Sequence, residues 1–195
     1  MSPASLRVTT PPAVEPVGVA ELKGHLRLDA GDTEEDAYLE GLIAAARLHA
    51  EAFTGRALIT QEITARWDAI PAEIRLPMGD VQALGAVTYT DTAGQAQTLA
   101  ADRYQADLSS IPARLRPAFG TSWPRARGGF AALSVAYTAG YGDGAEDVPA
   151  GLRQAILFLA AHWYEHREAV ACAQMAAVPF GVTSLLWMHR IRELG

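Results

Sequence analysis

Two histidines and a glutamate near the end of the chain have the types and spacing of a zinc site. His162, Glu165 and His166 form the string H-x-x-E-H, which inverzincin metalloproteases carry on a helix. Histidines four residues apart lie on one face of a helix, as two ligands of one ion must. Glu165 would then be the general base, so the pattern indicates metal-assisted hydrolysis, provided that a third protein ligand exists.

That third ligand is difficult to find in the sequence. Only 29 residues follow His166, and their acidic candidates are Glu168 and Glu193. Glu168 lies on a different face of the same helix, and Glu193 has no second helix to hold it. The alternative is that His162 lies at the edge of an apolar core while His166 is solvated. We therefore predict no catalytic residues, no metal and no cofactor, and keep a zinc metalloprotease as the alternative function.

Other motifs with chemical meaning are weaker or missing. The acidic, glycine-rich stretch at 140–147 suggests a calcium loop, but it lacks the alternating oxygen ligands of an EF-hand, and a turn before a helix explains it equally well. Neither a phosphate-binding G-x-x-x-x-G-K-[ST] loop nor a G-x-S-x-G elbow occurs. Cys172 is the only cysteine, which excludes an internal disulfide and fits assembly in a reducing cytoplasm.

Composition narrows the class of protein further. Half of the 195 residues are hydrophobic and 19% are charged, as in a globular protein. No window approaches 18 uncharged apolar residues, so we expect no membrane span. The net charge of −6 argues against binding nucleic acid by neutralising phosphates. An acidic surface could still face DNA and repel it.

Apolar periodicity predicts the helices that would position these residues. A short helix is expected near residues 19–26, and a longer one is expected from an N-cap at Asp32 or Thr33 to a stop at Gly55. Asp147 is the predicted N-cap of the helix that carries the histidines, which is apolar on nearly all sides and therefore buried. A last amphipathic helix is expected over 184–194.

In the middle of the chain, apolar residues recur at every second position, which is the period of β-strands. Alternating segments predict short antiparallel strands, with a hairpin around Ala93 and Gly94. We assign residues 58–140 to an inserted β unit and residues 17–57 and 141–170 to a helical bundle, and the proline-rich residues 1–16 to a flexible arm. The predicted fold class is thus mainly α (α+β): a helical bundle with a small antiparallel β insertion between the second and third helices.

The C-terminal segment, residues 171–195, has the composition of a contact surface. Aromatic, aliphatic and arginine side chains are concentrated within a few positions, as in interface hot spots: Leu185, Leu186, Trp187, Met188, Arg190 and Ile191. Either the segment packs on the protein's own bundle, or it inserts into a partner. The alanine-rich stretch 169–179 before it would allow a reach to another subunit.

Several of these stretches, in this order, resemble the head–tail connector (adaptor) family of long-tailed bacteriophages and phage-derived gene transfer agents. They are "GVAELKGHLRLD", "LIAAARLHAEAFTGRALITQE" followed by "IRLPMGDVQALGAVTYTD", and "VPAGLRQAILFLAAHWYEHREA" followed by "VPFGVTSLL". The resemblance covers about residues 16–188. It is carried by structural motifs, and in that family the tract around "HWYEHRE" is a structural helix.

The resemblance implies a structural protein and not an enzyme. It implies a ring of about twelve subunits between the portal and a tail-side connector or terminator protein, in the neck of a particle assembled in the bacterial cytoplasm, with DNA passing through and no membrane partner. It also implies that the six C-terminal side chains named above contact the portal. A monomeric assembly factor is a further alternative, which light scattering with and without the portal would separate from a ring subunit.

Overall fold

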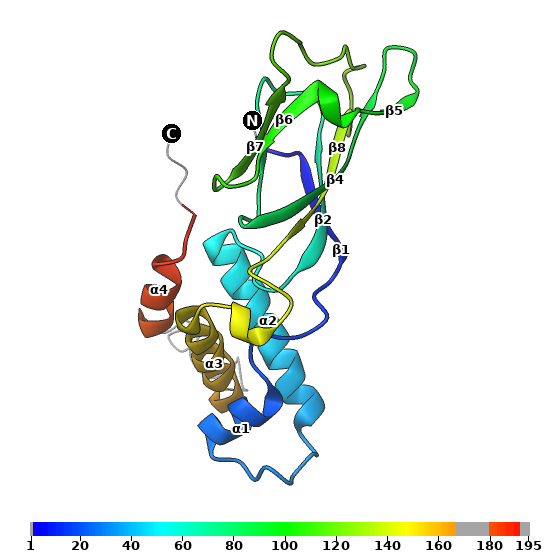
Figure 1. Ribbon diagram of the computed structural model, residues 1–195. Coiled ribbons are helices and arrows are strands. Elements are labelled where there is room, and N and C mark those ends of the chain that lie inside the picture. Colours follow the sequence, from blue (N-terminus) through cyan, green and yellow to red (C-terminus); the bar gives the residue numbers. More distant parts are fainter. Residues whose placement is uncertain (1, 167–179, 192–195) are drawn as a thin grey trace. The chain divides into compact units, whose positions relative to one another are not determined.

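The computed structural model describes residues 2–166 and 180–191, which divide into two units (Figure 1). Unit 1 contains residues 2–13 and 60–141, and unit 2 contains residues 14–59 together with the described residues after 141. The alanine-rich stretch 169–179 and residues 192–195 lie outside the described residues.

The prediction of a mainly α fold is wrong. Helices make up 32% of the structure and strands 28%, so the fold is α+β. Sequence reasoning underestimated the strands because many are short or half-exposed, and such strands have only a weak alternating pattern.

Unit 1 is built from two antiparallel sheets. The larger has the order β1-β2-β8-β4-β5, and the smaller has the order β3-β7-β6. The strands of the larger sheet are β1 (Ser5–Thr10), β2 (Gln61–Trp67), β4 (Val81–Thr90), β5 (Ala96–Thr98) and β8 (Leu133–Ala139). Those of the smaller sheet are β3 (Ile74–Leu76), β6 (Tyr104–Asp107) and β7 (Ala113–Pro117).

The larger sheet buries one face of its central strands. Every second residue of β2 and β8 is buried, as the period of two requires when one face covers a core. Trp67 and Val135 on that face are fully buried. The hairpin predicted around Gly94 is confirmed, since Thr90 of β4 pairs with Ala96 of β5.

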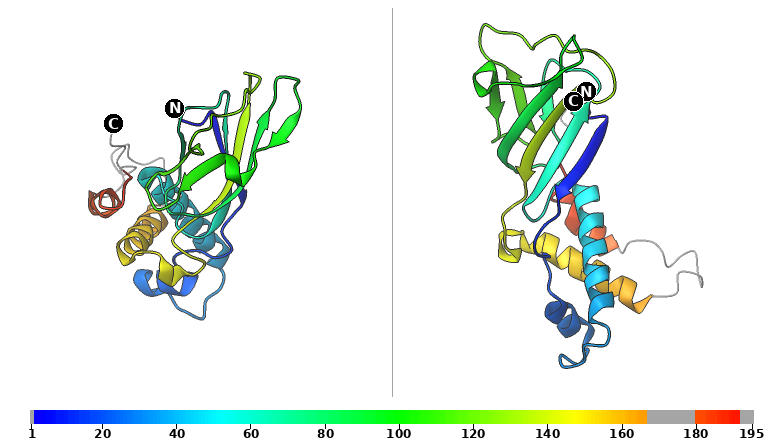
Figure 2. Two further views of the ribbon diagram at one scale, coloured as in Figure 1. Left: turned by 45° about the horizontal axis from the view of Figure 1, so that its top comes forward. Right: turned by 90° about the vertical axis from the view of Figure 1, so that its right-hand side faces the viewer.

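Strand β1 lies in the region where the prolines predict a flexible arm. It pairs antiparallel with β2, with Leu6 opposite Ala65 and Val8 opposite Ile63, and the right-hand view of Figure 2 shows it beside β2 at the sheet edge. All six β1 residues are exposed. Backbone hydrogen bonds therefore hold the strand, and such bonds leave no apolar pattern in the sequence.

In the described part of unit 2, four α-helices pack around an aliphatic core. They are α1 (Val19–Leu26), α2 (Asp36–Thr54), α3 (Ala150–Glu165) and α4 (Phe180–Trp187). The buried stripes of α2 and α3 consist of Leu39, Ile43, Ala46 and Ala50 on α2, and Leu152, Ile156 and Leu159 on α3. No helix among the described residues is long and apolar enough to cross a lipid bilayer.

Two predicted helix starts are displaced by local turns. Helix α2 begins at Asp36, because Asp32 accepts the Glu34 N–H at 3.0 Å in a turn before the helix. Helix α3 begins at Ala150, and Asp147 instead accepts the Gly144 N–H at 3.0 Å within a preceding 3₁₀ turn. Aspartate side chains accept backbone hydrogen bonds both in turns and at helix N-caps, so an aspartate in the sequence is compatible with either.

The predicted stop of α2 is confirmed, and it supports a stability prediction. Gly55 is left-handed, with φ 71°, and its N–H bonds to the Glu51 carbonyl. We expect Gly55→Ala to lower the free energy of unfolding by about 1 kcal/mol, because a Cβ disfavours this conformation. The matched control Gly41→Ala, inside α2 where an added Cβ meets no atom within 4 Å, should be neutral or stabilising. Urea denaturation measures both, and equal effects of the two variants would contradict the explanation.

Candidate interaction surface

The two histidines of the H-x-x-E-H string lie together on α3 and at its end. Their ring centroids are 4.4 Å apart, and Nδ1 of His166 lies 2.8 Å from the carbonyl oxygen of His162. Glu165 is exposed. Within residues 2–166 and 180–191, no three His, Cys, Asp or Glu side chains are grouped so that they could hold a metal ion. Glu168 and Glu193 lie outside the described residues.

Helix α4 and the residues after it pack against the protein's own helices. Val182 and Leu186 are each 1% exposed. Beyond the helix, the Ile191 N–H donates to the carbonyl of Thr54, the last residue of α2, at 2.8 Å, and Arg56 donates through Nε to the His189 carbonyl at 2.7 Å. These bonds fix the segment to the C-terminal end of α2.

The same segment presents an aromatic and cationic surface outward. The Trp187 ring lies edge-on to Phe53 with centroids 5.6 Å apart, and the Arg190 guanidinium lies over Trp187 at 4.7 Å from its centroid. Such cation–π contacts contribute about 0.5–1 kcal/mol at exposed sites. Phe180 and Met188 are 87% and 70% exposed. We call Phe180, Trp187, Met188 and Arg190 the outer patch.

The structure thus separates the six C-terminal residues predicted as a contact surface. Trp187, Met188 and Arg190 are exposed, whereas Leu186 belongs to the core of unit 2 and Leu185 and Ile191 are half-buried. Packing on the protein's own bundle therefore holds for Leu186, and the exposed Trp187, Met188 and Arg190 are the side chains that a partner could reach. Phe180 was missed in the sequence because it follows Pro179 and precedes the expected helix.

His189 gives this segment a pH-dependent contribution to stability. Burial, and then the charge of Arg56, lower the pKa of its imidazole. A histidine whose folded pKa lies below its unfolded value of about 6.5 stabilises the fold above that pH, and this contribution is lost as the pH falls through the folded pKa.

Wild type is therefore expected to lose more thermal stability than His189→Gln when the pH is lowered from about 7.5 to about 5.5. Because both proteins contain the other four histidines, the contributions of those histidines cancel when the two losses of stability are compared. Melting curves of both proteins at the two pH values measure the effect, and identical losses would show that His189 does not contribute it.

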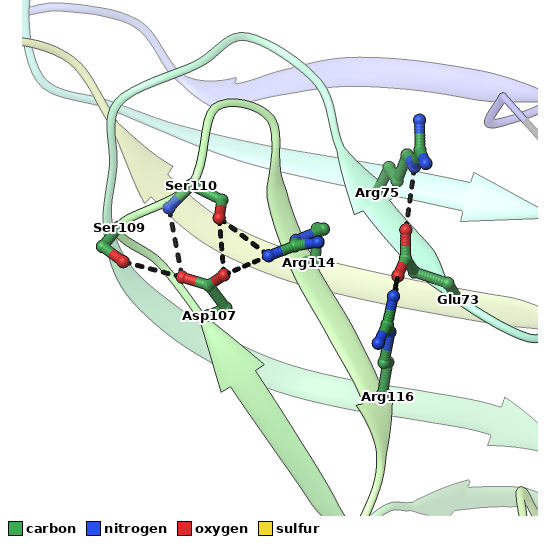
Figure 3. Close-up of polar contacts among 7 residues, drawn as sticks. All are labelled: Glu73, Arg75, Asp107, Ser109, Ser110, Arg114 and Arg116. Atoms are coloured by element: carbon green, nitrogen blue, oxygen red, sulfur yellow. Dashed lines mark hydrogen bonds and ion pairs between the residues drawn. The ribbon is translucent and has the colours of Figure 1, made fainter. Parts of the chain in front are cut away.

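A polar cluster on the smaller sheet of unit 1 was also missed. Asp107, at the end of β6, accepts hydrogen bonds from the hydroxyls of Ser109 and Ser110 at 2.8 and 2.5 Å and pairs with Arg114 of β7 at 2.6 Å (Figure 3). These bonds, the one from Ser110 first, lower the pKa of Asp107. The sequence signal is the spacing D-x-S-S, which is typical of a turn.

Beside this cluster, Glu73 connects two arginines. It accepts from Arg75 Nε at 2.9 Å and from Arg116 Nε at 2.5 Å, and these bonds lower the pKa of Glu73. Both clusters pair carboxylates held ionised with guanidinium groups, so neither offers a free base beside a nucleophile. Their geometry joins the strands of the sheet and does not indicate catalysis.

Comparison with known proteins gives the context for these surfaces. Residues 17–118 and 128–190 match the model of the family described as phage gp6-like head–tail connector protein. No curated protein sequence matches the chain.

Solved structures of particle necks are similar over nearly the whole chain. A chain in the neck of an empty gene transfer agent particle, computed with C6 symmetry, is 31% identical, with 98% of each chain covered and a TM-score of 0.78. A chain in the virion of a native gene transfer agent particle is 31% identical over 97% of each chain, with a TM-score of 0.74. A third, from a native neck computed with C12 symmetry, is 27% identical over 98% of each chain, with a TM-score of 0.71.

Proposed function

The chain belongs to the phage gp6-like head–tail connector family, and from this premise we propose that it is a structural subunit of the neck of a phage-like particle. The observation that carries the proposal is the likeness to chains from gene transfer agent necks over 98% of both chains. The relatives and the family are structural proteins, and the ion-paired carboxylates of unit 1 give no reason to assign catalysis.

We further propose that about twelve copies form a ring between the portal and a tail-side connector or terminator protein. The C12 symmetry used for one of the related necks supports this number. Copies related by a rotation meet through two different surfaces of the same chain, and such contacts close into a ring when the rotation is correct. The ring surrounds the channel through which DNA passes.

The outer patch is the proposed portal contact. It combines Trp187, Met188 and Arg190 on a segment that hydrogen bonds fix to α2, so little conformational entropy is lost when a partner binds. Aromatic and arginine side chains dominate the energetics of protein interfaces. Leu186 has the separate role of anchoring the segment within unit 2.

The acidic net charge suits a channel that DNA must slide through. A charge of −6 per chain favours repulsion of phosphate over binding. The expected potential of the assembled lumen is negative, and a positive lumen in an experimental ring structure would refute this part of the proposal.

Deletion of the gene from a particle-producing strain tests the proposed function. Heads are expected to assemble and package DNA but to lack tails, because the connecting layer is missing, and expression from a plasmid should restore tailed particles. Electron microscopy of the particles measures this. Normally tailed particles from the deletion strain would contradict a connector role.

A further inference from the structure

The loop between β7 and β8 holds one phenylalanine outward in a fixed geometry. Phe130 is 98% exposed, and both residues beside it have positive φ, 146° for Gly129 and 55° for Ala131. Their N–H groups donate to Asp68, at 3.2 Å to its carbonyl oxygen and at 2.9 Å to its carboxylate. A strained backbone persists only where its surroundings hold it, and it is common at binding sites.

The rest of this loop is cationic and is also held in place. Arg127 donates its N–H to the Thr90 carbonyl at 2.9 Å, and Trp123 donates through Nε1 to the Ala72 carbonyl at 3.1 Å. The side chains of Arg125 and Arg127 are exposed, and no acidic residue occurs from 118 to 131. Residues 119–127 are also unmatched by the family model, so this chemistry lies outside the pattern that the family shares.

Unit 2 has a groove whose charge is opposite to that of this loop. It has a volume of about 570 Å³ and is formed by residues 15–19 and by α2. Its lining residues include the apolar Val17, Val19 and Ile43 and the acidic Glu15 and Glu40. Glu15 is engaged by Arg47 at 2.8 Å, whereas Glu40 is exposed. The groove thus combines an apolar lining with negative charge.

We propose that Phe130 of one copy inserts into this groove of a second copy, with Arg125 and Arg127 directed at the exposed carboxylate of Glu40. The loop is aromatic and basic, and the groove is apolar and acidic, so the two are complementary in both respects. Two different surfaces of one chain that fit each other make a head-to-tail contact, which is the kind of contact a ring needs. The inference rests on the proposed ring and names the side chains that join its subunits.

Photo-crosslinking in assembled particles tests this contact. Phe130 is replaced with p-benzoylphenylalanine, which its exposure allows without disturbing the fold, and purified particles are irradiated. The expected product has twice the mass of the chain and joins position 130 to a peptide within residues 15–44. A link to a different protein, to another part of the chain, within a single copy, or no link at all would overturn the proposal.

A groove-filling variant gives a second readout. Gly41 is one of the residues that line the groove, and an added Cβ there meets no atom within 4 Å, so Gly41→Trp is designed to place a large side chain in the groove. It is expected to reduce the crosslinked product at least about tenfold, as loss of a hot-spot pocket does. The matched control is Gly24→Trp, on an equally open position of α1 away from the groove, which should leave the product unchanged.

The two proposals fail in different ways. If the chain is missing from purified necks, the proposed function is wrong. If it is present in the neck but Phe130 crosslinks elsewhere, or if Gly41→Trp and Gly24→Trp behave alike, only the inferred contact is wrong.

Discussion

Glu51→Ala is expected to lower the free energy of unfolding by about 2–4 kcal/mol, because it removes one of the two carboxylates that pair with the buried Arg47 and leaves the buried Leu58 N–H without its acceptor. Glu51 is 3% exposed and Arg47 is 7% exposed, and the two side chains bond at 2.9 Å one helical turn apart. Burial by itself would lower the pKa of Arg47, but the bond to Glu15 and the charge of Glu51 raise it. The carboxylate also accepts the Leu58 N–H at 3.0 Å, joining α2 to the chain that follows it.

A second substitution and a control separate the two roles of Glu51. Glu51→Gln keeps an oxygen that can accept the Leu58 N–H while it removes the charge, so it should cost less than alanine. Glu40→Ala, an exposed acid on the same helix, should change stability by no more than about 0.5 kcal/mol. Urea denaturation of the three variants measures these values. A cost for Glu51→Ala no larger than that of Glu40→Ala would show that the buried pair does not support the fold.

Replacing both Trp187 and Met188 with serine is expected to weaken binding to the portal at least about thirtyfold, which corresponds to the loss of about 2 kcal/mol at a hot spot. The two side chains are 47% and 70% exposed, so most of the effect should fall on binding rather than on folding. The measurement is equilibrium binding of the purified chain to purified portal rings, by light scattering or interferometry.

Two controls accompany the outer-patch variant. Leu48→Ser removes an apolar side chain that is 57% exposed on α2 and should leave portal binding unchanged. Met188→Ser alone keeps the contact between Trp187 and Phe53 intact. It should lose part of the portal affinity while its melting temperature stays unchanged. Unaltered portal affinity of the double variant would mean that the outer patch faces another partner or solvent.

Local backbone structure could be predicted from the sequence where a particular conformation strongly favours one residue type. Gly55 ends α2 because a left-handed residue is required there, and the hairpin at Gly94, with φ 84°, follows the same rule. The buried character of α3 could also be predicted, because its apolar side chains surround the helix.

Structure could not be predicted from the sequence where contacts between distant parts of the chain determine pairing or burial. Strand β1 exists because the edge of β2 is available for pairing, which no property of its own six exposed residues reveals. Leu186 and Trp187 are neighbours of similar hydropathy, yet one is buried and the other half exposed, because only one side of α4 faces the bundle. The exposure of Phe130 could not be predicted, since the hydrogen bonds that its neighbours Gly129 and Ala131 donate to Asp68 span more than 60 positions of sequence.

A cryo-electron microscopy reconstruction of the neck of the chain's own particle tests the central claim most directly. We expect a layer next to the portal in which twelve copies of this chain are traced, with the outer patch against the portal and Phe130 of each copy in the groove of the next. A neck layer built from a different protein, with no density for this chain, would contradict it.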